Sequence, residues 1–226
     1  MKNEKLSIGK AAYDAEYLNL PSDDGNLVSW DDIRYYEESE IAGDVPNMEI
    51  AGFFDPSATG TETSDCQGIV AVGRIARDGK LIHYVLDTFI KKAKLDEAVR
   101  VVYEKAKKFP RAVFGVETNV FSDWLKKEFD TRANETKRAV SWKPVKHHGK
   151  SKQERIRWLA PLIERGEIRF LKTQEDLLHQ LAYFGDPGVH DDGADALAGC
   201  FEVFAREPEK KSEPMVFFTG SPTRGS

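Results

Sequence analysis

Acidic residues at three separated places in the sequence have the side chains and positions that metal-assisted hydrolysis of a phosphodiester requires. Asp55 ends the apolar run MEIAGFFD, and Glu117 ends the apolar run AVFGVE. A carboxylate in such surroundings costs free energy unless it is paired or bound to a cation. Three further acids, Asp191, Asp192 and Asp195, stand directly before the apolar segment ALAGCFEVF. These five side chains are the candidate catalytic residues.

The cluster before ALAGCFEVF also has a purely structural interpretation. Asp191 and Asp195 are four positions apart and Asp192 and Asp195 three apart, so either pair can share one face of a helix. Acids at the start of a helix stabilise it through capping and the helix dipole. One aspartate would suffice for capping, however, and three exceed that need.

The elements that must position these carboxylates follow from the apolar periodicity. Apolar and β-branched runs predict strands at 48–55, 66–75 and 81–90, a meander with an Asp-Gly turn between the second and third. Further elements are expected as a helix over 95–109, a strand over 111–117, helices over 121–129, 152–165, 174–184 and 194–204, and short strands near 139–142 and 168–171. The fold class is therefore α/β, a mixed central sheet of a three-strand antiparallel meander plus parallel strands, with helices on both faces.

This topology brings the acids together. In such a meander the first and fourth strands are neighbours, so Asp55 and Glu117 are expected side by side, with the 191–195 cluster beside them. Converging carboxylates can hold two divalent cations about 3.5 to 4 Å apart, which activate water and stabilise the leaving oxygen of a phosphodiester. Hard oxygen ligands favour Mg²⁺ or Mn²⁺.

The charge distribution points to a nucleic acid partner. From Lys126 to Arg157, eleven Lys and Arg stand against four acids, a net charge of +7, and the formal charge of −5 for the whole chain leaves −12 for the remainder. Such a band favours a surface that contacts phosphates, although a solvated helix face with an adjoining loop is the alternative. Gly149-Lys150-Ser151 resembles the end of a nucleotide-binding loop, but Pro144 stands where that motif requires glycine.

The ends of the sequence differ in composition from its middle. Residues 1–47 are polar and acidic, with two short helical patterns near 11–18 and 29–38, and are expected to form an N-terminal arm or linker. Residues 48–206 form the expected domain, and 207–226 a flexible tail. The sequence has no apolar stretch long enough for a membrane span, so no membrane partner is expected. Cys66 and Cys200 lack metal-ligand spacing and are expected to be reduced and structural.

The motifs FFDPSATG, SDCQGIVAVG, FGVETN, KHHGKSKQERI and HDDGADALAG, over Met48 to Phe204, resemble the nuclease domain of tailed-bacteriophage terminase large subunits. The resemblance implies a ribonuclease H-like fold with metal ligands at Asp55, Glu117 and the 191–195 cluster. Within that cluster Asp191 and Asp195 are the favoured ligands, and which of the three acids binds the metal directly stays open. It also implies a supporting role for Asp65 or, equally, a turn cap. The residues it suggests for DNA binding are Lys143, Lys146, His148, Lys150, Lys152 and Arg155.

The function that the resemblance implies is cleavage of concatemeric viral double-stranded DNA during genome packaging, by a two-metal endonuclease in the cytoplasm of the bacterial host. Its implied partners are a terminase ATPase domain, to which the arm would connect, a small terminase subunit and a portal. Two alternatives remain: another ribonuclease H-like nuclease, such as a junction resolvase or transposase core, and a non-catalytic module that docks DNA or a portal.

Overall fold

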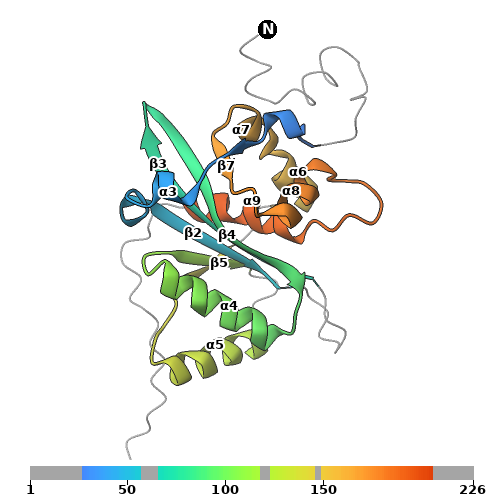
Figure 1. The fold of residues 1–226 in the computed structure, drawn as a ribbon. Coiled ribbons are helices and arrows are strands. Elements are labelled where there is room, and N and C mark those ends of the chain that lie inside the picture. Colours follow the sequence, from blue (N-terminus) through green and yellow to red (C-terminus); the bar gives the residue numbers. More distant parts are fainter. Residues whose placement is uncertain (1–26, 57–65, 118–122, 146–148, 206–226) are drawn as a thin grey trace, which may run out of the picture.

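A seven-stranded mixed sheet forms the centre of the protein in a computed structural model that describes residues 27–56, 66–117, 123–145 and 149–205 (Figure 1). The strands are β1 (Arg34–Tyr35), β2 (Glu49–Asp55), β3 (Cys66–Arg77), β4 (Lys80–Lys92), β5 (Val113–Glu117), β6 (Trp142–Val145) and β7 (Ile168–Phe170). Their order across the sheet is β1-β7-β4-β3-β2-β5-β6. The helices are η1 (Trp30–Asp32), α3 (Glu38–Ile41), η2 (Val45–Asn47), α4 (Leu95–Lys108), α5 (Asp123–Thr136), α6 (Lys152–Arg157), α7 (Ala160–Glu164), α8 (Glu175–Ala182) and α9 (Asp192–Ala205).

The pairing of the strands matches the expected topology. β2, β3 and β4 form the antiparallel meander, and β5 pairs in parallel with β2. β6 adds in parallel to β5, while β7 lies in parallel next to β4. The predicted α/β class and mixed sheet are therefore confirmed, and so is the prediction that the first strand of the meander neighbours the strand that ends in Glu117.

The central strands are apolar on both sides because helices cover both faces of the sheet (Figure 1). Phe53 and Phe54 show the alternation: Phe53 packs in the cluster with α9, whereas Phe54 packs in the cluster with α4. We call these the α9 face and the α4 face.

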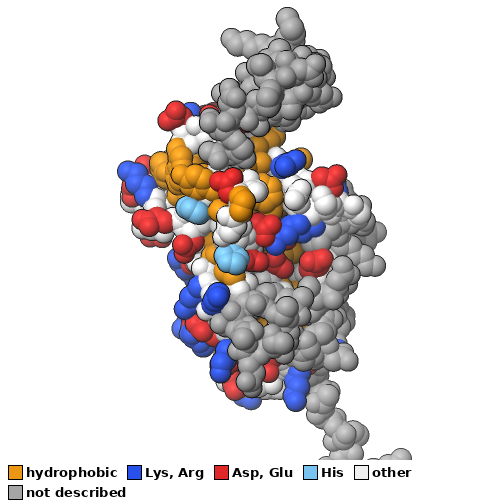
Figure 2. Space-filling view, turned by 90° about the vertical axis from the view of Figure 1, so that its right-hand side faces the viewer, with side chains coloured by type: hydrophobic (Ala, Val, Ile, Leu, Met, Phe, Trp, Pro, Cys, Tyr) orange, Lys and Arg blue, Asp and Glu red, His pale blue; other side chains and the backbone are white. Residues whose placement is uncertain are grey.

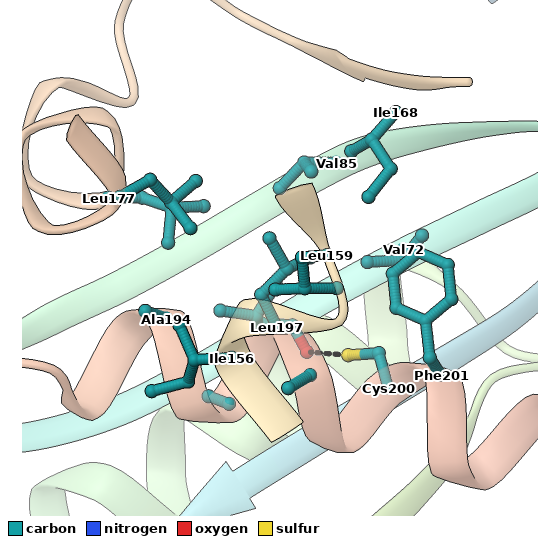
Figure 3. Packing of buried hydrophobic residues seen from close by; sticks show 14 of the residues in the cluster. Val72, Val85, Ile156, Leu159, Ile168, Leu177, Ala194, Leu197, Cys200 and Phe201 are labelled. Atoms are coloured by element: carbon teal, nitrogen blue, oxygen red, sulfur yellow. Dashed lines mark hydrogen bonds between the residues drawn. The ribbon is translucent and has the colours of Figure 1, made fainter. Parts of the chain in front are cut away.

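On the α9 face, residues of α6, α7, α8 and α9 meet β3 and β4 in one buried cluster (Figure 3). Leu197 and Cys200 of α9 lie in this cluster with Val72 of β3 and Val85 of β4. The Cys200 thiol donates to the carbonyl of Val70 at 3.4 Å, and both cysteines are free. Helix α9 is the central helix of this face, which explains why it is apolar nearly all round.

The α4 face is covered by α4 and α5, which pack against each other. Helix α4 is amphipathic and begins with Asp96 and Glu97, with Lys107 and Lys108 in its last turn, an arrangement that suits the helix dipole. Its buried side turns toward the sheet residues Phe54 and Phe114 in one cluster.

The structure differs from the sequence-based expectations in three elements. The short strand expected near 139–142 lies later in the chain, as β6 at Trp142–Val145, where it pairs with β5. The helix expected over 29–38 is wrong: β1 pairs in parallel with β7 there, and the buried Tyr36 hydroxyl donates to the carbonyl of Val85 at 2.8 Å. Within the segment expected as an arm, residues 27–47 thus pack on the domain. The single helix expected over 152–165 is two short helices, because Pro161 at the start of α7 has no N–H and cannot continue α6. The helix expected near 11–18 lies outside the described residues.

Candidate metal centre

The carboxyl ends of β2 and β5 bring two of the candidate acids to one end of the sheet. The parallel register pairs Phe54 with Val116, so Asp55 and Glu117, the next residue on each strand, emerge side by side. The charge of Glu117 is among the causes that raise the pKa of Asp55, which agrees with this closeness. The convergence expected from the topology is therefore present for these two residues.

The start of α9 reaches the same end of the sheet through a close approach of backbones. Gly68 of β3 is the register partner of Asp55, and a Cβ atom added to Gly68 would lie 2.3 Å from the carbonyl oxygen of Asp192. Real Cβ atoms do not approach a carbonyl oxygen so closely, so only glycine lets the helix start sit this near the strand. The sequence-based argument did not identify Gly68.

Gln180 of α8 takes up part of the capping of α9. Its Oε1 atom accepts from the backbone N–H groups of Gly193 and Ala194, at 2.8 and 3.2 Å. Two of the N–H groups that lack partners at a helix start are thus satisfied by a buried side chain from another helix. The structural interpretation of Asp191, Asp192 and Asp195 as caps loses weight accordingly. No pattern in the sequence pointed to Gln180.

Lys152 lies among four of the carboxylates. Its ammonium nitrogen is 2.8 Å from Asp191 Oδ1, and the next distances are longer. It lies 3.7 Å from Asp195 Oδ2 and 3.8 Å from both Asp55 Oδ2 and Asp192 Oδ1. Burial opposes the charge of Lys152, but the hydrogen bond with Asp191 and the charges of Asp55 and Asp195 outweigh it and raise its pKa. Lys152 is therefore a protonated counter-ion of the acidic cluster.

The capping of α6 at its first turn directs Lys152 and Arg155 toward the acids. Ser151 caps the helix: its hydroxyl accepts from the Glu154 N–H at 3.2 Å, and the Glu154 carboxylate accepts from the Ser151 N–H at 2.6 Å. This capping box places Lys152 in the first turn, three residues before Arg155 and on the same side of the helix. The Ser-x-x-Glu pattern is the sequence signal of this helix start, which was correctly predicted at Lys152.

Arg155 binds Asp195 through paired contacts. Its Nη2 donates to both carboxylate oxygens, at 2.7 and 2.8 Å, and Nε donates to Oδ1 at 3.2 Å. The side chains are only 8% and 5% exposed, so this is a buried, multidentate ion pair. In this arrangement the guanidinium is turned inward to the cluster, whereas the sequence predicted that it binds DNA.

The electrostatics of Asp55 reflect an excess of acid. Burial and, after it, the charge of Asp195 raise the pKa of Asp55 to about 7, against the lowering effect of Lys152. The charges of Asp192 and Glu117 add to the increase. Among the described residues at this end of the sheet, Lys152 and Arg155 contact four carboxylates, Asp55, Asp191, Asp192 and Asp195, so these acids outnumber the two cations that contact them.

The donor set suits a hard divalent cation. The five acids offer oxygen atoms, which Mg²⁺ and Mn²⁺ prefer. Cys66 lies nearby, but burial, followed by the charge of Asp192, raises the pKa of its thiol to about 11, so it stays protonated and is a poor ligand. As they stand, no three Asp, Glu, His or Cys side chains within the described residues are arranged to hold a metal ion, and it is Lys152 that lies between the carboxylates.

The remaining predicted site residues are placed as follows. Lys150 is exposed just before α6, and Lys143 lies in β6 beside β5. Asp65, Lys146 and His148 lie outside the described residues. Figure 2 shows acidic and basic side chains gathered at mid-height on the face that carries α6 and α8.

The basic band of the sequence is divided between the two faces of the sheet. Its first part, with Lys126 and Lys127, belongs to α5, which packs on α4, whereas Lys152 and Arg155 belong to α6, which packs on α9. One continuous segment of sequence therefore does not make one continuous basic surface, because α5 and α6 lie on opposite faces of the sheet (Figure 1).

Comparison with solved structures places this geometry in a known fold. The P22 large terminase nuclease domain superposes with a TM-score of 0.56 at 15% identity, covering 81% of this chain and 93% of that one. The nuclease domain of the large terminase g2p from bacteriophage SPP1, with bound Mn, gives 0.52 at 16% identity over 78% and 99%. The human cytomegalovirus terminase nuclease domain gives 0.50 at 12% identity over 80% and 96%. The protein has the terminase nuclease fold.

This confirms the predicted ribonuclease H-like fold and the resemblance on which it rested. The HK97 bacteriophage large terminase matches with a TM-score of 0.52 at 12% identity, over 79% of this chain but 43% of that one, so the terminase nuclease fold corresponds to part of that longer protein. No protein-family model and no curated protein sequence matches the chain. No helix in the described ranges is long and apolar enough to cross a membrane.

Proposed function

We propose that the protein is the nuclease domain of a terminase large subunit, a divalent-metal-dependent endonuclease that cleaves concatemeric viral double-stranded DNA during genome packaging. The observation that carries the proposal is the convergence of Asp55, Glu117 and the 191–195 cluster from β2, β5 and α9 at one end of a terminase nuclease fold. Four of these carboxylates have an oxygen within 3.8 Å of one point, the Lys152 nitrogen.

Asp55, Glu117 and the 191–195 cluster would hold Mg²⁺ or Mn²⁺, as two ions when DNA is bound. When bound, the ions would supply an activated water and stabilise the leaving oxygen. The role of the protein is to orient the carboxylates: β2 and β5 hold two of them in register, and Gly68 and Gln180 hold the start of α9 against the sheet. The bound Mn of the SPP1 structure supports this choice of metal.

Lys150, Lys143, Lys146 and His148 would contact the DNA backbone beside the metal centre. Lys150 is exposed and stands two residues before Lys152, whose nitrogen contacts the carboxylates. It is therefore close to the metal centre in the sequence. Phosphate contacts carry no sequence information and weaken with salt, so cutting by the domain should be largely non-specific and salt-sensitive. The domain would act together with a terminase ATPase domain, a small terminase subunit and a portal, in the cytoplasm of the bacterial host.

Plasmid cleavage with Mn²⁺, Mg²⁺ or EDTA tests the proposal. The variants are Asp55→Asn and Glu117→Gln, and the matched control is Asp96→Asn, which neutralises an exposed carboxylate of α4 on the other face. We expect metal-dependent cleavage by the parent and by the control, and none by the two site variants, with circular dichroism verifying that all are folded.

Equal cleavage by the parent and both site variants would contradict the site. Cleavage that prefers four-way junctions over linear duplex would favour a resolvase-like enzyme instead. If the parent fails to bind Mn²⁺ in a titration and cuts nothing, the protein is a DNA or portal docking module rather than an enzyme.

A further inference from the structure

We infer that Lys152 is an internal counter-cation of the metal centre, which a divalent ion must displace, and that it therefore sets the metal affinity of the site. The inference rests on the proposed function and adds to it a residue that controls when the centre is loaded. The sequence predicted only that Lys152 contacts DNA, and its position among Asp55, Asp191, Asp192 and Asp195 is what suggests the different role.

The first argument is the need for a positive charge. Asp195 is 5% exposed and Asp55 is 14% exposed, so both carboxylates have lost most of their water. Carboxylates removed from water and placed near one another are unfavourable unless a cation neutralises them. Among the described residues, Lys152 has its nitrogen within 4 Å of four carboxylates, including these two, so it does for the metal-free protein what a metal would do for the loaded one.

The second argument is that the ammonium and a metal exclude each other. A Mg²⁺ ion binds oxygens at about 2.0 to 2.1 Å, so an ion ligated by Asp191 and Asp195 would have to lie between oxygens that now surround Lys152. The nitrogen is already 2.8 Å from Asp191 Oδ1. Two cations that close repel strongly in a partly buried site, and the doubly charged ion attracts the carboxylates more strongly.

The third argument is that Lys152 is able to leave, whereas Arg155 is not. The Lys152 side chain is 34% exposed and has one short contact, with the others at 3.7 and 3.8 Å. Arg155 is 8% exposed and holds Asp195 through paired contacts. A lysine side chain is also flexible, so it can swing toward solvent while its Cα stays in the first turn of α6. Displacement thus removes one positive charge and leaves the buried pair intact.

Mn²⁺ binding tests the inference without reference to cleavage. Free Mn²⁺ is followed by electron paramagnetic resonance for the parent, Lys152→Gln, Lys152→Arg and the control Lys107→Gln, which removes an exposed lysine of α4. We expect Lys152→Gln to bind Mn²⁺ about tenfold more tightly, because the competing charge is gone. Lys152→Arg, which keeps the charge, and Lys107→Gln should stay near the parent.

Thermal unfolding in EDTA provides a second readout. Lys152→Gln should unfold at a lower temperature than the parent, since four carboxylates have lost their counter-ion, and it should gain more from added Mn²⁺. In the double variant Lys152→Gln with Asp195→Asn, the gain in Mn²⁺ affinity should disappear. Persistence of the gain would mean that the ion binds elsewhere and would overturn the inference.

If Lys152→Gln does not fold, the parent protein still decides. The side-chain NMR signal of Lys152, assigned through Lys152→Arg, should shift on titration with Mg²⁺, while that of buried Lys105 on the other face should not. Equal Mn²⁺ affinity of the parent and Lys152→Gln, or an unchanged Lys152 signal on saturation, would overturn the inference and leave the metal centre standing. No Mn²⁺ binding by any variant would overturn the metal centre and the inference together.

Discussion

Two lysines with carboxylate partners, one on each face of the sheet, differ in the balance of charge around them. On the α4 face, Lys105 pairs with Asp87 of β4, and Lys108 reaches the other oxygen of the same carboxylate at 3.2 Å. On the α9 face, Lys152 lies among four carboxylates. Within the described part of the chain, the ion pairs of the first group join two lysines to one acid, and those of the second join Lys152 and Arg155 to four acids.

This difference in charge balance distinguishes a structural ion pair from a site that needs a further cation. Lys105 is held by a single acid, and burial lowers its pKa although Asp87 opposes this effect, so its cost is that of one buried charge. At the start of α9, burial and then the charges of the neighbouring acids raise the pKa of Asp55 to about 7. An excess of acid beyond the resident cations is what a cation-binding site requires, whereas a structural pair is complete in itself.

The largest contrast is expected when each group loses an acid. Asp55→Asn should weaken Mn²⁺ binding by more than about a hundredfold, beyond the effect of losing a supporting residue. It should also stabilise the metal-free protein at pH 8 by about 1 kcal/mol, because it removes a carboxylate whose raised pKa shows that its charge is unfavourable there. Asp87→Asn should leave Mn²⁺ binding unchanged and cost roughly 3 kcal/mol, because Lys105 stays buried without its partner. Urea unfolding in EDTA measures both stabilities, and a loss of stability in both variants would break the comparison.

Steric substitutions sharpen the same comparison. An added Cβ at Gly68 would meet the Asp192 carbonyl, and one at Gly52 would lie 2.3 Å from the buried ring of Phe114 on the α4 face. Both Gly68→Ala and Gly52→Ala should cost about 1 to 3 kcal/mol through overpacking. Only Gly68→Ala should weaken Mn²⁺ binding, by about tenfold, because it moves the start of α9. Equal Mn²⁺ affinities in calorimetric titration would show that this close approach does not position the site.

The far end of α9 is expected to respond to pH in a way that the α4 face does not. His83 is buried, with its ring centroid 4.7 Å from that of Phe201, and burial lowers its pKa, with Arg74 adding to the effect. The unfolded chain therefore binds the proton more readily than the folded one, so the contribution of neutral His83 to stability is present above pH 6.5 and is lost as the pH falls below it. The parent should lose at most about 1.4 kcal/mol per pH unit from this group, and His83→Phe should lose less. If the free energies of unfolding of the parent and of His83→Phe fall in parallel as the pH decreases, this assignment is contradicted.

The smallest effect concerns the exposed lysines. Lys150→Ala, next to the proposed metal centre, should reduce the slope of log affinity for duplex DNA against log salt by about 0.9, the value for one phosphate contact. Lys107→Ala, exposed on the α4 face, should leave the slope unchanged. Fluorescence anisotropy with EDTA present measures both slopes, and equal reductions would mean that DNA does not distinguish the two faces.

Much of the fold could be predicted because its signals are local. The apolar runs of β2, β3 and β4 and the 3.6-residue period of α4 are properties of neighbouring residues, and the positions of Asp55 and Glu117 at strand ends follow from them. The stretch 29–38 was mistaken for a helix because pairing with β7, far along the chain, decides its conformation. The basic band was predicted to form one surface because closeness in the sequence does not show on which face of the sheet each part of a segment lies.

By itself, the sequence determined which chemistry is available: carboxylates at the ends of apolar strands and before a helix, a basic segment, and the pattern that resembles terminase nucleases. Only the tertiary structure decided how these groups are used. It placed Lys152 and Arg155 against the acids, and it gave part of the capping of α9 to Gln180. The physical reason is that these contacts depend on how α6, α8 and α9 pack and on the space that Gly68 leaves, and such long-range fits leave no period in the sequence.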